Sequence, residues 1–159
     1  MRNTLIGLLI AAAPATLGGQ SVETNRTYHG DYYVLFTTGS CQHAYPFYGV
    51  AGGAEALVWK GLTIGADASY QQFRNSFSFG LATLQAGYHF RGKNRAARWD
   101  PFASYGIGVG MASRLAGSGS LGGGLTYWVR DRVGARFEAR VQGVGGELLG
   151  TIRVGVSFR

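Results

Sequence analysis

The stretch LTIGADASYQ, residues 62–71, alternates an apolar residue with a small or polar one at every step. Successive side chains of a β-strand point to opposite faces, so this pattern predicts a strand with one apolar and one polar face. Two later stretches, VGARFEARVQ at 133–142 and LLGTIRVGVSF at 148–158, follow the same period of two. The chain is therefore expected to be all-β.

The composition also favours folded β structure. Only 14% of the residues are Asp, Glu, Lys or Arg, whereas a soluble domain carries roughly 25%. The 27 glycines are too many for helix interiors. They follow no strict period of three, which excludes collagen, and an aromatic content of 13% argues against disorder.

Turn residues divide the chain into eight predicted strands. These strands cover residues 31–38, 47–59, 62–71, 77–90, 101–112, 120–130, 133–142 and 148–158. Tight turns at Lys60-Gly61 and residues 130–132 alternate with loops at 39–46, 73–76, 113–119 and 143–147, and residues 91–100 form a longer basic turn. Strands joined this closely must be antiparallel neighbours. Within 77–90 the alternation changes parity, which predicts a β-bulge near Leu81.

Two eight-stranded barrels fit this pattern: a membrane barrel with its apolar face outward, and a soluble lipocalin-like binder with its apolar face inward. Glycine favours the membrane barrel, because small residues suit the crowded interior of a narrow barrel. The polar face carries Gly49, Gly53, Gly65, Gly106, Gly108, Gly110, Gly122, Gly124, Gly134 and Gly155.

Aromatic residues support the same choice, because lipid interfaces favour two aromatic girdles. One predicted girdle, near the short turns, contains Tyr88, Phe90, Trp99, Tyr105 and Tyr127, and the other contains Tyr48 and Tyr70.

The sequence resembles the small eight-stranded bacterial outer-membrane β-barrels, of the type of the OmpA transmembrane domain and OmpX. The resemblance covers residues 31–159 and is carried by the turn at 59–62, the strands at 101–110 and 133–140, and the closing residues 155–159. It implies an up-and-down transmembrane barrel in the outer membrane, with both termini and the short turns in the periplasm.

The resemblance also implies partners. They are outer-membrane lipid and lipopolysaccharide around a monomeric barrel, and the barrel-insertion machinery. That machinery reads a terminal aromatic residue in this family, a role that we assign to Phe158, although Arg159 follows it.

Residues 1–15 are interpreted as an export signal peptide. Arg2 gives a basic start, residues 4–13 an apolar run, and Ala13-Pro14-Ala15 a small-x-small cleavage site. The apolar run is shorter than the roughly 20 residues of a membrane-spanning helix. Residues 16–30 are expected to be a flexible segment, with a plug inside the barrel as the alternative. Export also argues against nucleic acid as the reason for the formal charge of +7.

Charged residues on the inward face predict a salt-bridged lumen. They are Glu55, Asp67, Arg136, Glu138, Arg140 and Arg153, with Gln85 and His89 beside them. Buried charges must be paired or hydrated. We interpret the group as a structural plug, and a pathway for small solutes or ions is the alternative.

No catalytic site is predicted. Lipid A deacylases of similar size use a His and a Ser two residues apart on a lipid-facing strand, and none of His29, His43 and His89 has such a serine. Cys41 is the only cysteine, which excludes an intrachain disulfide and a cysteine metal cluster. We interpret it as an incidental loop thiol, and an intermolecular disulfide is the alternative. We expect neither a cofactor nor a metal. The sequence favours a structural or interaction role in the outer membrane, then a small-solute channel, then a lipid-modifying enzyme or a soluble binder.

Overall fold

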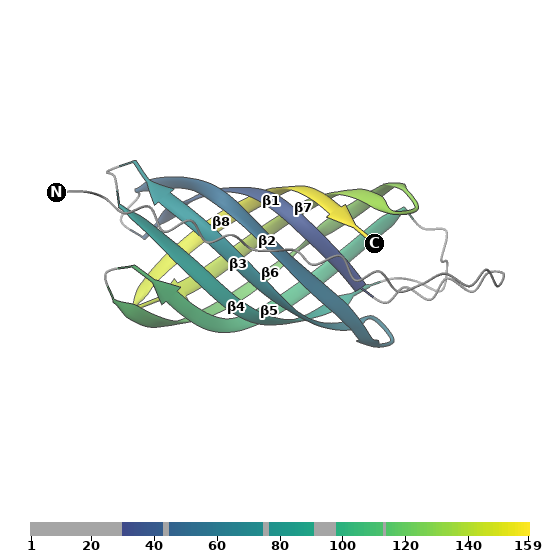
Figure 1. Ribbon diagram of the computed structural model, residues 1–159, viewed down its shortest axis with the longest axis horizontal. Coiled ribbons are helices and arrows are strands. Elements are labelled where there is room, and N and C mark those ends of the chain that lie inside the picture. Colours follow the sequence, from purple (N-terminus) through teal and green to yellow (C-terminus); the bar gives the residue numbers. More distant parts are fainter. Residues whose placement is uncertain (1–29, 43–44, 75–76, 91–97, 113) are drawn as a thin grey trace, which may run out of the picture.

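The computed structural model is a closed barrel of eight antiparallel strands, each paired with its sequence neighbours (Figure 1). It describes residues 30–42, 45–74, 77–90, 98–112 and 114–159. The strands are β1 (Gly30–Cys41), β2 (Pro46–Trp59), β3 (Leu62–Phe73), β4 (Ser78–His89), β5 (Trp99–Met111), β6 (Leu115–Arg130), β7 (Val133–Val144) and β8 (Glu147–Phe158). The predicted eight-stranded, up-and-down architecture is confirmed.

The N-terminal predictions concern residues outside the described part of the chain. This applies to the signal peptide at 1–15 and to the flexible segment at 16–30, apart from Gly30, which already belongs to β1. Among the described residues there is no helix long and apolar enough to cross a membrane.

The barrel closes where β1 pairs with β8, in a ladder that runs from Tyr32↔Phe158 to Cys41↔Leu149. Closure leaves no strand edge with unpaired backbone groups, which is the condition for a sheet to exist in lipid.

The two ends of the barrel carry different connections (Figure 1). The turn end holds Lys60-Gly61, Asp131-Arg132 and the end of β8, and the loop end holds the connections between β1 and β2, β3 and β4, β5 and β6, and β7 and β8. At the loop end, Gly145 and Gly146 have φ values of +59° and +93°, and at the turn end Lys60 and Gly61 have +40° and +99°. Two successive positive φ values match the twist of a β-hairpin. The loop predicted at 143–147 is therefore a tight turn.

The bulge predicted near Leu81 is wrong. β4 keeps one register with β3 from Leu62↔Tyr88 to Gln72↔Ser78, and its pairing with β5 is also continuous. Phe79 and Leu81 consequently face inward on the same side as Thr83. The hydrophobic pattern changes parity along β4 although the strand does not, because the inward side chains of β4 are apolar near the loop end and polar farther along.

Two register shifts occur in the described strands, and both lie beside tight turns. One falls between Leu57 and Trp59, before the Lys60-Gly61 turn, and the other between Trp128 and Arg130. β6 also begins at Leu115 rather than at residue 120, so the loop before it is shorter than predicted.

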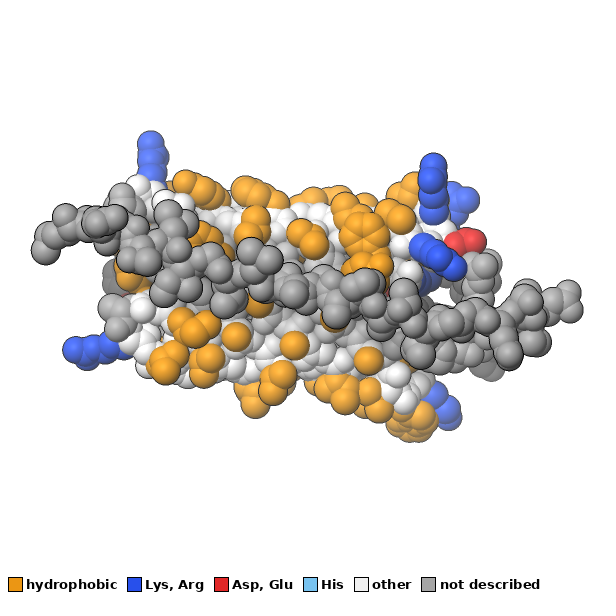
Figure 2. All heavy atoms as spheres, in the orientation of Figure 1, with side chains coloured by type: hydrophobic (Ala, Val, Ile, Leu, Met, Phe, Trp, Pro, Cys, Tyr) orange, Lys and Arg blue, Asp and Glu red, His pale blue; other side chains and the backbone are white. Residues whose placement is uncertain are grey.

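Outward side chains form an apolar belt around the barrel. Val34, Leu84, Leu121 and Ile152, from four different strands, are each at least 60% exposed. Figure 2 shows hydrophobic side chains along the flank of the barrel, with Lys and Arg at its two ends on the face in view. Such a surface would be costly in water and suits a hydrocarbon environment.

Inward side chains fill the barrel in two zones. Near the loop end the packed residues are apolar: Phe47, Phe79, Leu81 and Leu149. Toward the turn end most of the buried residues are polar or charged, and the rings of Tyr33, Phe102 and Trp128 are buried among them. Glycine leaves room for them, since a Cβ at Gly53 would lie 2.6 Å from the hydroxyl oxygen of Tyr33.

Candidate functional site: the lumen charge cluster

Six charged side chains from β2, β3, β7 and β8 meet inside the barrel, and we call them the lumen cluster. They are the carboxylates Glu55, Asp67 and Glu138 and the guanidinium groups Arg136, Arg140 and Arg153, each at most 6% exposed. These are the six residues that the sequence predicted on the inward face. Three negative and three positive groups balance, so the cluster carries no net charge when all are ionised.

Arg136 connects opposite walls of the lumen. Its Nη1 donates to Glu55 Oε1 at 2.6 Å, and its Nη2 donates to Glu138 Oε2 at 3.5 Å. The guanidinium carbon also lies 4.2 Å from the ring centroid of Tyr33 and 4.0 Å from that of Phe102. Contacts of this kind with a ring face attract the cation, so Arg136 is held both by charge and by packing.

Arg140 and Arg153 share the remaining carboxylates. Arg140 donates from Nε to Glu138 Oε1 at 2.6 Å and from Nη1 to Asp67 Oδ1 at 3.4 Å. Arg153 Nη1 donates to the two oxygens of Asp67 at 3.1 and 3.0 Å. Because each of the three carboxylates has at least one guanidinium partner, the Coulomb attraction offsets the cost of removing these ions from water.

Two neutral side chains extend the network. Gln85 donates to the Tyr33 hydroxyl at 2.8 Å, and that hydroxyl donates to Asp67 Oδ2 at 3.2 Å. Arg140 Nη2 donates to Gln85 Oε1 at 3.1 Å. Sequence reasoning placed Gln85 inward but missed Tyr33, because the apolar Leu35 also faces inward in β1 and weakens the alternation there.

A second polar group lies at the turn end. His89 Nδ1 is 3.0 Å from Asp100 Oδ1, and His89 Nε2 is 3.3 Å from Glu55 Oε2. Arg159 Nη2 donates to Asp100 Oδ2 at 3.4 Å, and its guanidinium lies 3.5 Å from the ring centroid of Trp128. The sequence placed Asp100 in a basic turn, whereas the structure has it inward in β5. Arg159, which departs from the family pattern, contacts this group from the end of β8.

The predicted interface aromatics all point outward. Tyr48 and Tyr70 lie near the loop end, and Tyr88, Phe90, Trp99 and Tyr127 lie near the turn end. The ring centroids are 5.1 Å apart in the Tyr88–Phe90 pair and 4.6 Å apart in the Trp99–Tyr127 pair. Tyr105 lies half-way along β5, deeper than a girdle position.

Within the described ranges, no group of three or more His, Cys, Asp and Glu side chains is arranged to hold a metal ion.

An apolar exterior, a charged interior and a closed sheet of eight antiparallel strands define the class of small transmembrane β-barrels. No protein-family model matches the sequence, and no curated protein matches it. Solved structures do match. Neisserial surface protein A aligns with a TM-score of 0.66 and 12% identity over 82% of this chain and 95% of that chain.

Two further solved structures share the fold. The outer-membrane enzyme PagL aligns with a TM-score of 0.61 and 16% identity over 80% of this chain and 99% of that chain. The N-terminal barrel domain of Pseudomonas aeruginosa OprF aligns with a TM-score of 0.56 and 19% identity over 80% of this chain and 97% of that chain. The resemblance inferred from the sequence is thus confirmed: the chain has the fold of small eight-stranded outer-membrane β-barrels.

Proposed function

We propose that the chain is an integral outer-membrane β-barrel with a structural or interaction role, whose lumen is closed by the lumen cluster. The observation that carries this proposal is the balanced set of three carboxylates and three guanidinium groups, bonded to one another across the barrel. The apolar belt and the shared fold support the membrane location.

Geometry supports a closed lumen. The interior of an eight-stranded barrel is just wide enough for side chains to fill it. Arg136 lies between the rings of Tyr33 and Phe102, and the Arg153–Asp67 pair joins β8 to β3. A solute would have to break these contacts to pass.

The outer surface supports the proposed partners. Its apolar belt would contact outer-membrane lipid and lipopolysaccharide, and a barrel closed on itself needs no second copy to cover an edge, which favours a monomer. Phe158 points outward at the end of β8, where insertion machinery could read it.

A non-enzymatic role is part of the proposal. Of the three histidines, the structure describes His89, which lies inside the lumen rather than on the lipid-facing surface. Both of its ring nitrogens lie within hydrogen-bonding distance of carboxylates, so neither is available to activate a hydroxyl group.

One observation favours the second candidate, a small-solute or ion channel. Arg153 Nε, Arg153 Nη2 and Gln71 Oε1 are buried without a hydrogen-bond partner among the described residues. Buried polar atoms of this kind normally bind water. The lumen wall could therefore support a hydrated pathway beside the paired charges.

Planar-bilayer recording of the refolded barrel distinguishes the two candidates. Folded protein is first identified by its altered gel migration without boiling. This control ensures that a lack of conductance reflects a closed barrel and not protein that failed to fold. The proposal expects no steady conductance from the wild type and a small anion-preferring conductance from Glu138→Ala. Glu147→Ala is the matched control, because Glu147 is exposed outside the cluster. Steady conductance from the wild type would contradict the closed lumen and support the channel.

A further inference from the structure

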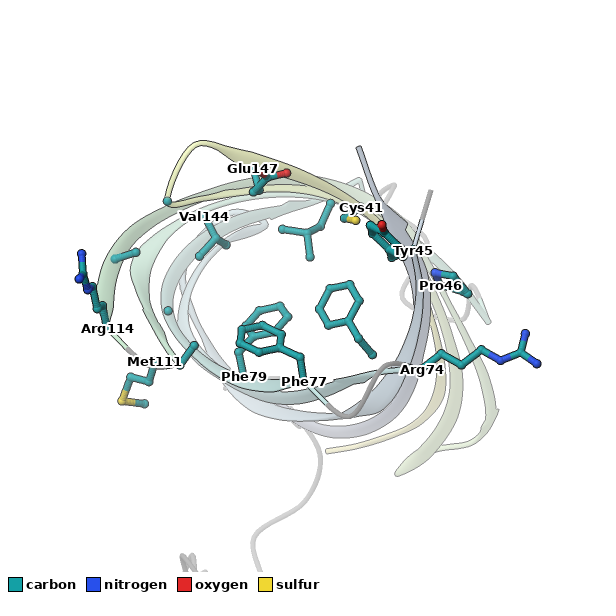
Figure 3. Close-up of a pocket in the computed structure, with 16 residues that line it drawn as sticks. Cys41, Tyr45, Pro46, Arg74, Phe77, Phe79, Met111, Arg114, Val144 and Glu147 are labelled. Carbon is teal, nitrogen blue, oxygen red and sulfur yellow. The ribbon is translucent and has the colours of Figure 1, made fainter. Parts of the chain in front are cut away.

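At the loop end the lumen opens into a pocket of about 530 Å³, which we call the apolar cup (Figure 3). Its inner wall includes Cys41, Phe73, Phe77, Phe79, Val144 and Leu149, which come from five strands and one connection. None of these side chains is charged.

Aromatic rings form one side of the apolar cup. The ring centroid of Phe73 lies 5.9 Å from that of Phe77 and 5.8 Å from that of Phe79. In Figure 3, Phe77, Phe79 and Val144 project into the opening.

Three charged residues among those that the structure describes border the opening, and none of them belongs to the inner wall. The guanidinium groups of Arg74 and Arg114 extend away from the opening in Figure 3, and Glu147 lies exposed at the rim. A charged ligand would therefore find no partner deep in the cup, and burying an unpaired charge is strongly unfavourable.

The cup is closed on its inner side. Phe79 and Leu149 of its inner wall pack against Phe47 and Leu81, which lie behind them and do not line the cup, and this packed cluster forms its floor. Farther along β8, the inward residues after Leu149 are Thr151 and Arg153, so the lumen cluster follows the floor directly. The cup is thus a blind pocket and not the mouth of an apolar tunnel.

Apolar lining at this place is unusual for this barrel. The inward surface farther toward the turn end is mainly polar and charged. An apolar wall that faces an open end stays in contact with water. A ligand that covers the wall would release this water. Ligand pockets have about this size, commonly about 300–1,000 Å³, and are lined mainly by apolar and aromatic side chains.

We propose that the apolar cup is a binding site for a small uncharged apolar molecule, alkyl or aromatic, which enters from the loop end. This site goes beyond the proposed function, because it does not require the lumen to conduct or to be closed by charges.

Cys41 provides a reporter, because it is the only cysteine and lines the cup. The protein is refolded in lipid vesicles, and the rate of Cys41 modification by a water-soluble maleimide is measured with increasing 1-N-phenylnaphthylamine, an uncharged aromatic probe. A site on the cup predicts saturable protection, with modification about tenfold slower at a probe concentration near ten times its dissociation constant.

Two variants make the test specific. Phe77→Ser should raise the dissociation constant of the probe, measured from the protection of Cys41, about tenfold, because an aromatic contact with the probe is lost. Leu115→Ser, on the outer surface of the same end, should leave this dissociation constant unchanged. Phe77 is 50% exposed, so its replacement is compatible with folding.

A control reporter accounts for probe dissolved in the lipid. In the double variant Cys41→Ser, Asp131→Cys, the thiol lies in the exposed turn at the opposite end, and the probe should not protect it. Equal protection of both thiols, or no protection of Cys41 in barrels with folded gel migration, would overturn the apolar cup as a binding site. Failure to fold into lipid at all would instead contradict the proposed function.

Discussion

The ring of Tyr32 in β1 stacks on the ring of Phe158 in β8, with the centroids 5.4 Å apart and the planes inclined by 18°. The same two residues are direct partners in the backbone ladder that closes the barrel. An aromatic pair therefore lies on the outside of the seam between the first and last strands, and it gives Phe158 a contact besides its proposed role as an insertion signal.

A double-mutant cycle should detect this contact. Tyr32→Ala and Phe158→Ala are expected to be coupled by about 0.5–1.5 kcal/mol, the usual range for stacked aromatic pairs. The measurement is the free energy of unfolding by urea in lipid vesicles. Tyr32→Ala combined with Tyr105→Ala, on the distant strand β5, should be additive. Equal coupling energies in the two cycles would mean that the ring contact contributes nothing specific.

Glu138→Ala should be strongly destabilising. The change leaves two carboxylates facing three guanidinium groups, and Arg140 loses the partner of its Nε. Breaking a buried ion pair in this way costs about 3–5 kcal/mol. The urea midpoint reports the loss, and exposed Glu147→Ala should change it little. If the two variants have equal midpoints, water already solvates the cluster, which would favour the channel.

Tyr33→Phe should destabilise by about 1–3 kcal/mol, because Gln85 loses its acceptor and Asp67 loses a donor while both stay buried. The aromatic ring that contacts Arg136 is kept, so the change isolates the hydroxyl group. Tyr70→Phe removes the same atom from an outward position and should have almost no effect. Thermal or urea unfolding in vesicles compares the two, and equal losses would argue against the hydrogen bonds of Tyr33.

Ala68→Arg should cost about 2–4 kcal/mol, because Ala68 faces outward midway along β3, where a charge would lie near the centre of the bilayer. Val58→Arg, also outward but beside the Lys60-Gly61 turn, should cost only about 0–1 kcal/mol. The difference in unfolding free energy between the two variants measures how deep in the bilayer each residue lies. A larger cost for Val58→Arg would show that the barrel sits differently in the membrane.

The period of two was enough to predict the barrel. Alternation at 62–71 and 133–142 identified strands and their polar faces, and short turns required antiparallel neighbours. Charges on those faces then predicted which residues enter the lumen. All six members of the lumen cluster lie inside the barrel because strand parity fixes the direction of every side chain.

Strand parity could not predict which partners each inward side chain contacts in the lumen. Tyr33 and Asp100 join the polar network through residues on other strands, and these neighbours depend on how the strands are staggered around the barrel. Phe79 and Leu81 were misread because an apolar residue was assumed to face lipid. Near the loop end the inside of the barrel is itself apolar, so hydrophobicity alone could not distinguish the two faces of β4.

The pairing within the lumen cluster also has a kinetic consequence. Arg153 and Asp67 are separated by 86 positions in the sequence, and Arg136 and Glu55 by 81. No single hairpin contains both partners of either pair, so a hairpin that entered the bilayer alone would carry charges without their counterions. Contacts so distant in sequence give a high contact order, which slows folding. The strands are therefore expected to cross the membrane together, in one slow and cooperative step, with the barrel closing as its charges meet.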